Sequence, residues 1–210
     1  MKRLLLVAAV SIPAVAFTFG GWAVTTVENV PEYAAAGKPF ELTYTVRQHG
    51  MTLLSGLAGT VSASSGSETK TFGALGIGEG MYRSTITLPK AGEWDLTIQT
   101  GFINSRSSLM PIKVIAANAP APAPMSPVDR GHQLYVAKGC ASCHSHQLTK
   151  EYNLTKMGPD LSEPKFAAPY LTRFLTNPAV KTDWKSDQRM PNLGLKPAEI
   201  TALIAFLNNK

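Results

Sequence analysis

The residues best suited to chemistry form one short run, Cys140-Ala-Ser-Cys143-His144, in the C-terminal half of a 210-residue sequence. C-x-x-C-H is the attachment motif of a c-type haem. Two thiols three positions apart on a helical turn reach both vinyl groups at one porphyrin edge, and the imidazole that follows meets the iron from one side. We therefore predict one covalent haem c, bound by Cys140 and Cys143, with His144 as an axial iron ligand.

A C-x-x-C pair alone also occurs in redox dithiols and as half of a zinc site. The chain has two cysteines in total, so it has no second pair to complete a zinc site. No strand–helix–strand pattern surrounds the pair, as a thioredoxin-like motif would require. The histidine follows directly, so haem attachment is the reading that we favour.

A second axial ligand is sought among His146, Met157 and Met190. His146 is two residues from His144 and cannot reach the opposite face, so we expect an ordinary surface histidine. Met157 directly precedes Gly158-Pro159, where the backbone should lie near the His144 side. Met190 lies far enough along the chain to return on the other face. We predict His144 and Met190 as the metal ligands, with core packing as the alternative for any single methionine.

Residues 1–16 have the features of a secretory signal. A short basic start, Met1-Lys2-Arg3, precedes an apolar run that ends in the small-residue site Ala14-Val15-Ala16. The alternative is an uncleaved membrane anchor, because apolar residues continue through Val24, close to the roughly 20 needed to span a bilayer. Either way we expect export to the periplasm, as a soluble protein or tethered to the outer face of the cytoplasmic membrane.

Charge and composition exclude several classes of protein. Hydrophobic residues make up 44% of the chain, too many for a disordered charged tail. Lys and Arg number 20 against 14 Asp and Glu, without a dense basic run, so we expect no nucleic-acid partner. The excess lies after residue 118, and we expect it to steer acidic redox proteins or a membrane complex. The cations near the motif are Lys138, Lys150, Lys156, Lys181, Lys185 and Arg189.

Hydrophobic patterning divides the rest into two domains. Residues 17–115 alternate polar and apolar residues between turn signals, which predicts about seven short strands and an immunoglobulin-like antiparallel β-sandwich. Residues 116–127 alternate Ala and Pro and are predicted to be a semi-rigid linker. Residues 128–210 are predicted to be all-helical around one haem. We expect its helices at Val128–Lys138, Pro169–Asn177 and Pro197–Asn208.

Residues 129–209 contain Cys140-Ala-Ser-Cys143-His144, Gly158-Pro159-Asp160-Leu161 and Met190-Pro191. On these motifs the segment resembles a class I, mitochondrial-type monohaem cytochrome c. The resemblance implies that Gly131 and Tyr135 of the first helix cross closely over the last helix. It also implies that the Pro159 carbonyl accepts the second ring N–H of His144. The matching residues are Gly131, Tyr135, Leu203-Ile204-Ala205-Phe206-Leu207, Gly158-Pro159-Asp160-Leu161 and Met190-Pro191.

This sequence departs from the family in two places. Gly139 is one extra residue before the first cysteine, and residues 162–189 are shorter than in mitochondrial forms. The short segment leaves the haem propionate contacts open. Tyr170, Arg173 and Trp184 are candidates, with packing or solvated surface as the alternative for each.

The front domain contains short runs such as Gly21-Trp22-Ala23-Val24 and Arg47-Gln48-His49-Gly50. On such runs it resembles, more weakly, the exported β-sandwich domains of the FixH/YtkA-like type, which implies a respiratory context. The resemblance rests on Gly21-Trp22-Ala23-Val24, Gly37-Lys38-Pro39, Arg47-Gln48-His49-Gly50, Gly80-Met81-Tyr82 and Gly92-Glu93-Trp94. His49, Met51, Met81 and Met110 are the side chains that could form a soft copper site. We favour core methionines and a turn histidine instead.

These observations predict an electron-transfer protein rather than an enzyme, because His/Met ligation leaves no open iron position. We expect a carrier, or a subunit of a respiratory or photosynthetic chain, in which the linker lets the haem domain swing between donor and acceptor. One alternative is a peroxidase-like enzyme, if the Met190 position is open. Another is a copper-handling or oxidase-assembly protein in which the haem is secondary.

Overall fold

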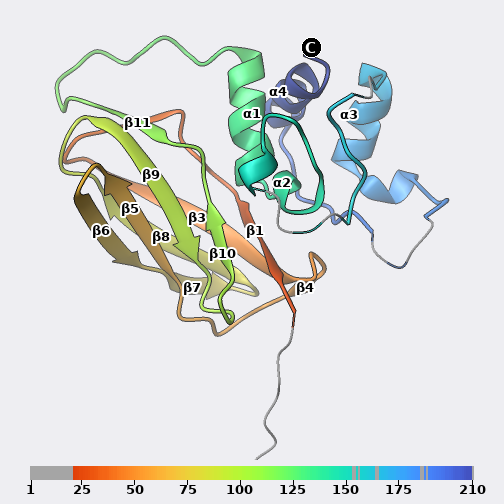
Figure 1. Cartoon of the computed structure of the whole chain (residues 1–210), viewed down its shortest axis with the longest axis horizontal. Coiled ribbons are helices and arrows are strands. Elements are labelled where there is room, and N and C mark those ends of the chain that lie inside the picture. The colour runs from red at the N-terminus through yellow and green to blue at the C-terminus, as the bar shows by residue number, and fades with distance from the viewer. Residues whose placement is uncertain are drawn as a thin grey trace, which may run out of the picture.

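The computed structural model describes residues 21–152, 155, 157–163, 166–184, 187 and 189–209. A β domain of two sheets is followed by a helical domain that stands at one end of the sheets (Figure 1). The predicted signal segment, residues 1–16, lies outside the described residues. Within the described part, no helix combines the length and apolar character needed to cross a membrane.

The β domain contains eleven strands in two sheets. The five-stranded sheet has the order β1-β3-β8-β7, with β4 paired to β3, and the six-stranded sheet has the order β2-β11-β9-β5-β6, with β10 paired to β9. The strands are β1 (Ala23–Val27), β2 (Tyr33–Ala35), β3 (Pro39–Gln48), β4 (Thr52–Leu53), β5 (Thr60–Ser65), β6 (Glu68–Gly73), β7 (Leu75–Gly78), β8 (Met81–Thr87), β9 (Gly92–Gln99), β10 (Arg106–Ser108) and β11 (Ile112–Ile115).

The period-2 pattern produces a shared core between the sheets. On β9, Trp94, Leu96 and Ile98 are fully buried while the residues between them are more exposed. The pattern also predicts the inward face of β3, where Leu42 and Tyr44 are fully buried. β-structure in this region is therefore confirmed, although short edge strands bring the number to eleven. The pairing is not wholly antiparallel, because β11 runs parallel to β2.

Strand β1 departs from the alternating pattern, because all five of its residues are buried. One face of a sheet normally remains in contact with solvent in such a domain. The second face of β1 lies against the helical domain, where it contacts α1 and the residue before the first cysteine. The burial of both faces therefore marks a domain interface.

The helical domain consists of α1 (Pro127–Ala137), α2 (Cys140–Cys143), the 3₁₀ turn η1 (Lys150–Tyr152), α3 (Ala168–Thr176), the 3₁₀ turn η2 (Pro178–Val180) and α4 (Pro197–Leu207). The three longer helices begin and end within one residue of the predicted bounds. Helix α1 begins at a Ser126 hydroxyl that accepts from the Asp129 amide at 3.1 Å. At α4, the Lys196 amide donates to Glu199 Oε2 at 2.9 Å. Both helices therefore start at capping residues.

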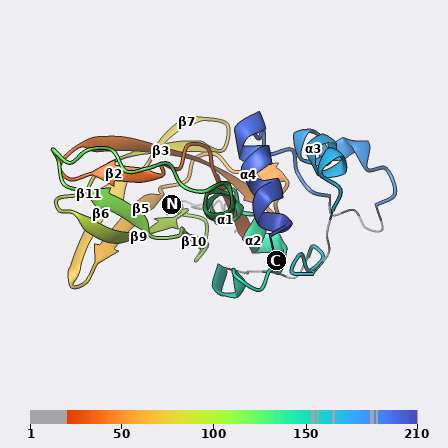
Figure 2. The same cartoon turned by 90° about the horizontal axis from the view of Figure 1, so that it is seen from above.

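Helices α1 and α4 cross at Gly131. A Cβ atom at this position would lie 2.0 Å from the Ala202 carbonyl oxygen, so only glycine allows this approach. The rings of Tyr135 and Phe206 lie 5.4 Å apart beside the crossing. The expected contact of this glycine and aromatic with the last helix is confirmed. Figure 2 shows α1 between the sheets and α4, with α3 on the far side.

Side chains of α1 fix the helical domain to the segment that joins β1 to β2. Arg130 Nη2 donates to the Val30 carbonyl at 3.0 Å, and Gln133 Nε2 donates to the Pro31 carbonyl at 3.1 Å. Residues 116–126 carry no helix or strand. The structure thus places the two domains in direct contact, whereas the swinging haem domain expected from the sequence requires them to be apart.

Candidate functional site

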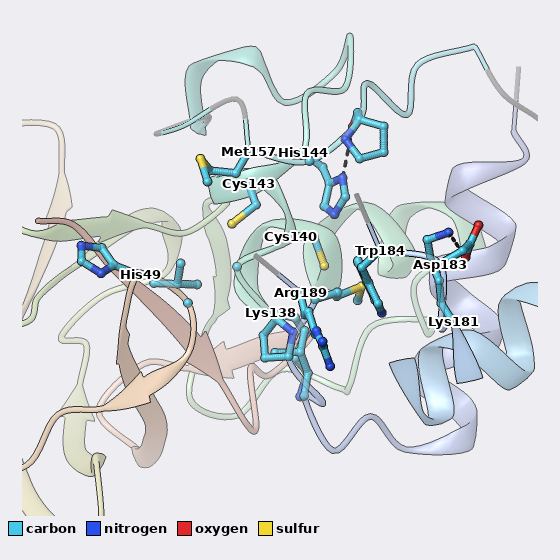
Figure 3. A pocket seen from close by; sticks show the side chains of 18 residues that line it. His49, Lys138, Cys140, Cys143, His144, Met157, Lys181, Asp183, Trp184 and Arg189 are labelled. Atoms are coloured by element: carbon cyan, nitrogen blue, oxygen red, sulfur yellow. Dashed lines mark hydrogen bonds and ion pairs between the residues drawn. The ribbon is translucent and has the colours of Figure 1, made fainter. Parts of the chain in front are cut away.

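Four predicted site residues line one cavity of about 450 Å³: Cys140, Cys143, His144 and Met190. Gly158 and Pro159 line it as well, so all six predicted site residues lie at the same place. Figure 3 shows the two cysteines and His144 around this cavity, with His49 of the β domain on one side and Trp184 on the other. Val24, Pro191 and Leu193 form an apolar part of the cavity lining.

Both cysteines lie on the single turn of α2. Gly139 begins this turn in the left-handed region, at φ 79°, and the His144 amide closes it on the Cys140 carbonyl at 2.9 Å. Burial and the neighbouring Cys143 thiol raise the pKa of Cys140 to about 12, and burial raises the pKa of Cys143. Free thiols here are therefore protonated at neutral pH, unlike the low-pKa thiols of redox dithiols.

The residues around the pair do not form a zinc site. Among the described residues, no group of three or more His, Cys, Asp and Glu side chains is arranged to hold a metal ion. A structural zinc site needs four such ligands. The described part of the chain therefore offers the cysteine pair no zinc-binding partners.

His144 is held by its own backbone surroundings. Its Nδ1 lies 3.1 Å from the Pro159 carbonyl oxygen, so the ring donates this N–H and keeps Nε2 as the free lone pair. Burial lowers the pKa of His144, against the opposing effect of that carbonyl, so the neutral ring is favoured. A Cβ on Gly158 would lie 2.4 Å from the imidazole, and this glycine therefore leaves space for the ring.

The two candidate methionines both line the cavity but differ in their surroundings. Met190 is partly buried and packs against the core cluster. Met157 is 49% exposed and directly precedes Gly158, which lies against the His144 ring. Met157 is therefore next to the residue that packs on the His144 ring, and its place on the histidine side of the cavity stays a prediction.

His146 is buried, and the expectation of a surface histidine is wrong. Its ring is 3% exposed and lies 4.5 Å from the ring of Phe206 and 5.7 Å from that of Tyr135. Burial, and secondarily the nearby His132, lower its pKa. The residue fills the core behind the Cys-His turn, where Tyr135 also donates to the His144 carbonyl at 3.2 Å.

Lys138 does not belong to the exposed cations expected from the sequence. Its side chain is 1% exposed, and its Nζ lies 2.9 Å from Glu199 Oε1 and 3.1 Å from the Glu28 carbonyl. Lys150 and Arg189 are exposed, while Lys181 pairs with Asp183 at 2.7 Å. Lys156 and Lys185 lie outside the described residues. Among the described cations of this set, Lys138 and Lys181 are therefore each paired with a carboxylate.

Of the three residues considered for propionate contacts, Trp184 lines the cavity. Tyr170 instead stacks on Phe174, with ring centroids 5.8 Å apart. The cavity lining includes Lys181 and Arg189 on the Trp184 side, and the sequence reading did not assign them to this role.

The β domain contributes Val24, His49 and Gly50 to the cavity, which sequence reasoning missed. One signal in the sequence indicated this contact between the domains. It is the extra Gly139 before the first cysteine, where a Cβ would lie 2.6 Å from the Thr25 carbonyl oxygen.

Of the copper candidates, His49 packs edge-on to Trp22 at 5.7 Å. Met81 begins β8 in one sheet, whereas Met110 follows β10 of the other.

The donor set of the cavity fits a covalently bound haem. Two thiols lie on one turn, an imidazole offers Nε2, a thioether lines the same space, and the volume lies in the usual range for cofactor pockets. Gly158 supplies the close approach that a larger residue would block.

Comparison with known proteins agrees with this geometry. Residues 128–210 match the family model of cytochrome c. No curated protein matches the chain.

Similar solved structures include FdeC, an adhesin of Escherichia coli, at 22% identity and a TM-score of 0.38, covering 47% of this chain and 32% of that one. They also include a superoxide reductase (neelaredoxin) from Ignicoccus hospitalis, at 18% identity and a TM-score of 0.32, covering 44% of this chain and 80% of that one. The chain spans 13–32% of four of the similar structures. Scores this low support no argument about function.

Proposed function

Because residues 128–210 form a cytochrome c domain, whose cofactor is covalently attached haem c, we propose that the chain is a periplasmic electron-transfer protein with His144 and Met190 as axial iron ligands. It would act as a carrier or as a subunit of a respiratory or photosynthetic chain. The observation that carries this proposal is the single cavity lined by Cys140, Cys143, His144 and Met190.

Each residue has a distinct task in this scheme. The bound haem supplies one-electron exchange between Fe(III) and Fe(II). Cys140 and Cys143 would hold the group by thioether bonds. The Pro159 carbonyl fixes the His144 ring at 3.1 Å and makes it a stronger donor. Met190 lines the same cavity from the loop that precedes α4 and would supply a thioether ligand, and thioether ligation raises the potential.

Export and partner type rest on separate observations. The pattern of residues 1–16 supports a periplasmic location. The exposed cations Lys150 and Arg189 support an acidic redox partner. If these charges steer association, the rate of reduction by such a partner falls as the salt concentration rises. A rate independent of salt would remove the steering argument.

The test of the ligand assignment is a matched pair of variants, Met190→Ala and Met157→Ala, matured in a host that attaches haem c. We expect Met190→Ala to lose the sulfur–iron absorption band of the oxidised protein, to move toward a high-spin spectrum and to lower the potential. Met157→Ala should keep the native spectrum. If the effects are reversed, Met157 is the ligand, and if the wild type is colourless, the electron-transfer proposal fails.

A further inference from the structure

We infer that the β domain is part of the haem site: β1 and the turn between β3 and β4 form a wall on the cysteine side of the cavity, and this wall limits the access of water and redox reagents. The inference rests on the proposed function, because it assigns a role toward the haem. It goes beyond that function by assigning the role to residues outside the cytochrome c domain.

The two domains approach each other closely beside the first cysteine. At Gly139, a Cβ atom would lie 2.6 Å from the Thr25 carbonyl oxygen and 2.7 Å from Val24 Cγ1. Strand β1 thus runs directly against the residue that precedes Cys140. Val24 is 5% exposed and lines the cavity. The cysteine edge is therefore covered by the β domain.

The turn between β3 and β4 extends this wall toward Met190. His49 and Gly50 line the main cavity, and the next residue, Met51, lines a second cavity of about 370 Å³ together with Met190 and Pro191. Figure 3 shows His49 on the cysteine side of the main cavity. The same turn therefore borders both cavities beside the predicted methionine ligand.

Three donors, two on α1 and one at its C-cap, hold the wall in place. Arg130, Gln133 and Lys138 donate to the carbonyls of Val30, Pro31 and Glu28 at 3.0, 3.1 and 3.1 Å. All three acceptors are backbone atoms of the segment that follows β1. Because backbone acceptors cannot rotate away as side chains do, these bonds fix the position of β1 relative to α1.

Lys138 favours the arrangement in which the two domains are in contact, because it has a partner on each of them. Its cation is 1% exposed and has two partners, Glu199 on the helical domain and the Glu28 carbonyl on the β domain. Separating the domains removes one of these partners and wets the cavity that Lys138 lines. The apolar shell around a metal site controls solvent access and redox potential, so the wall tunes the haem by keeping it dry.

The test uses the full-length holoprotein with Val24→Asp, which places a carboxylate in the interface. Val180→Asp is the matched control, because it makes the same chemical change at a valine that is 54% exposed. We measure the radius of gyration by small-angle scattering, the reduction potential, and the rate at which imidazole displaces the methionine ligand. We expect Val24→Asp to enlarge the particle, lower the potential and speed imidazole binding, and Val180→Asp to match the wild type.

A second variant, Arg130→Ala with Gln133→Ala, opens the interface without burying a charge. Losing two hydrogen bonds should raise the open population about 30-fold, which corresponds to about 2 kcal/mol at roughly 1 kcal/mol per bond. Faster imidazole binding in this variant supports the wall even if Val24→Asp does not fold.

Three results overturn the inference. The first is an extended wild-type particle in solution. The second is a pair of interface variants that enlarge the particle without changing the potential or the imidazole rate. The third is a set of variants indistinguishable from the wild type in every measurement. All three leave the red, methionine-ligated protein of the proposed function intact, whereas loss of the haem itself would count against that function and not only against the wall.

Discussion

Replacing Gly131 by alanine should destabilise the helical domain, against the usual preference of helices for alanine. The new Cβ would lie 2.0 Å from the Ala202 carbonyl oxygen and 2.7 Å from Phe206 Cβ. Carbon atoms in ordinary contact lie about 3.5–4.0 Å apart. The first obstacle is backbone and cannot rotate away, so α1 and α4 must separate by more than about 1 Å to restore contacts of this kind.

The size of the effect follows from three contributions. Overpacking of this kind costs about 1–3 kcal/mol. Separation also weakens the ring pair of Tyr135 and Phe206, worth about 0.5–1.5 kcal/mol at its 5.4 Å spacing. Against this, alanine is favoured over glycine inside a helix by about 1 kcal/mol. The net loss in the free energy of unfolding is about 2 kcal/mol.

The assay is guanidinium unfolding of the holoprotein, followed by far-ultraviolet circular dichroism and by haem absorption. Gly73→Ala is the control, because a Cβ there meets nothing within 4 Å and its cost should stay within about 0.5 kcal/mol. A Gly131→Ala protein as stable as the wild type, or more stable, would refute the close crossing of α1 and α4.

Three further predictions follow from other contacts. Gly158→Ala places a Cβ 2.4 Å from the His144 ring and should perturb the spectrum of the oxidised haem protein, as absorption spectroscopy will show. Tyr44 has a buried hydroxyl without a hydrogen-bond partner among the described residues, whereas the Tyr82 hydroxyl donates to a carbonyl at 2.6 Å. In urea unfolding, Tyr44→Phe should therefore cost nothing or add about 1 kcal/mol, while Tyr82→Phe loses about 1–2 kcal/mol. Burial, with a smaller effect of Tyr82, raises the pKa of Tyr44 from 10.0 to about 12, so its titration costs the fold no stability below pH 10 and lowers the stability as the pH rises through 12. Alkaline unfolding should thus shift to higher pH in Tyr44→Phe, and an unchanged midpoint would contradict the assignment. Lys138→Met should lower stability by about 3 kcal/mol in the same urea assay, because it removes the cation from the largely buried Glu199 carboxylate, which keeps the hydrogen bond from the Lys196 amide.

Local patterns predicted the elements of this protein well. The alternation of Trp94, Leu96 and Ile98 marks a strand with one buried face, and the stripe of apolar residues after Pro197 marks α4. Both patterns are written in contiguous residues, so sequence reasoning reaches them. The Cys-His motif and Met190 likewise predicted residues that line one cavity, because haem attachment needs particular residue types at particular spacings.

The contacts between the domains left little trace in the sequence. Arg130 and Gln133 donate to backbone carbonyls, and any residue can supply a carbonyl, so no complementary partner is visible. Lys138 was expected to be a solvated cation for the same reason, because its partners, Glu199 and the Glu28 carbonyl, are distant in the sequence. His146 was misjudged because its distance from His144 says what it cannot bind, but not what packs around it.

The short edge strands could not be predicted from the alternation of polar and apolar residues. β2 and β10 have three residues each, too few to establish an alternation. The parallel pairing of β2 with β11 depends on where the chain returns after β9, which is a long-range property. These elements could be placed only once the whole sheet had formed.

The Ala/Pro segment at residues 116–126 changes how strong the domain contacts need to be. As an extended chain it reaches at most about 34 Å, so it holds the two domains at an effective concentration on the order of 1 mM. An interface with a Kd of about 10 µM, too weak to keep separate chains together in a dilute compartment, is then closed about 99% of the time. The linker thereby makes a stable domain interface from a few polar contacts, and a longer linker would weaken that interface without altering any of its contacts.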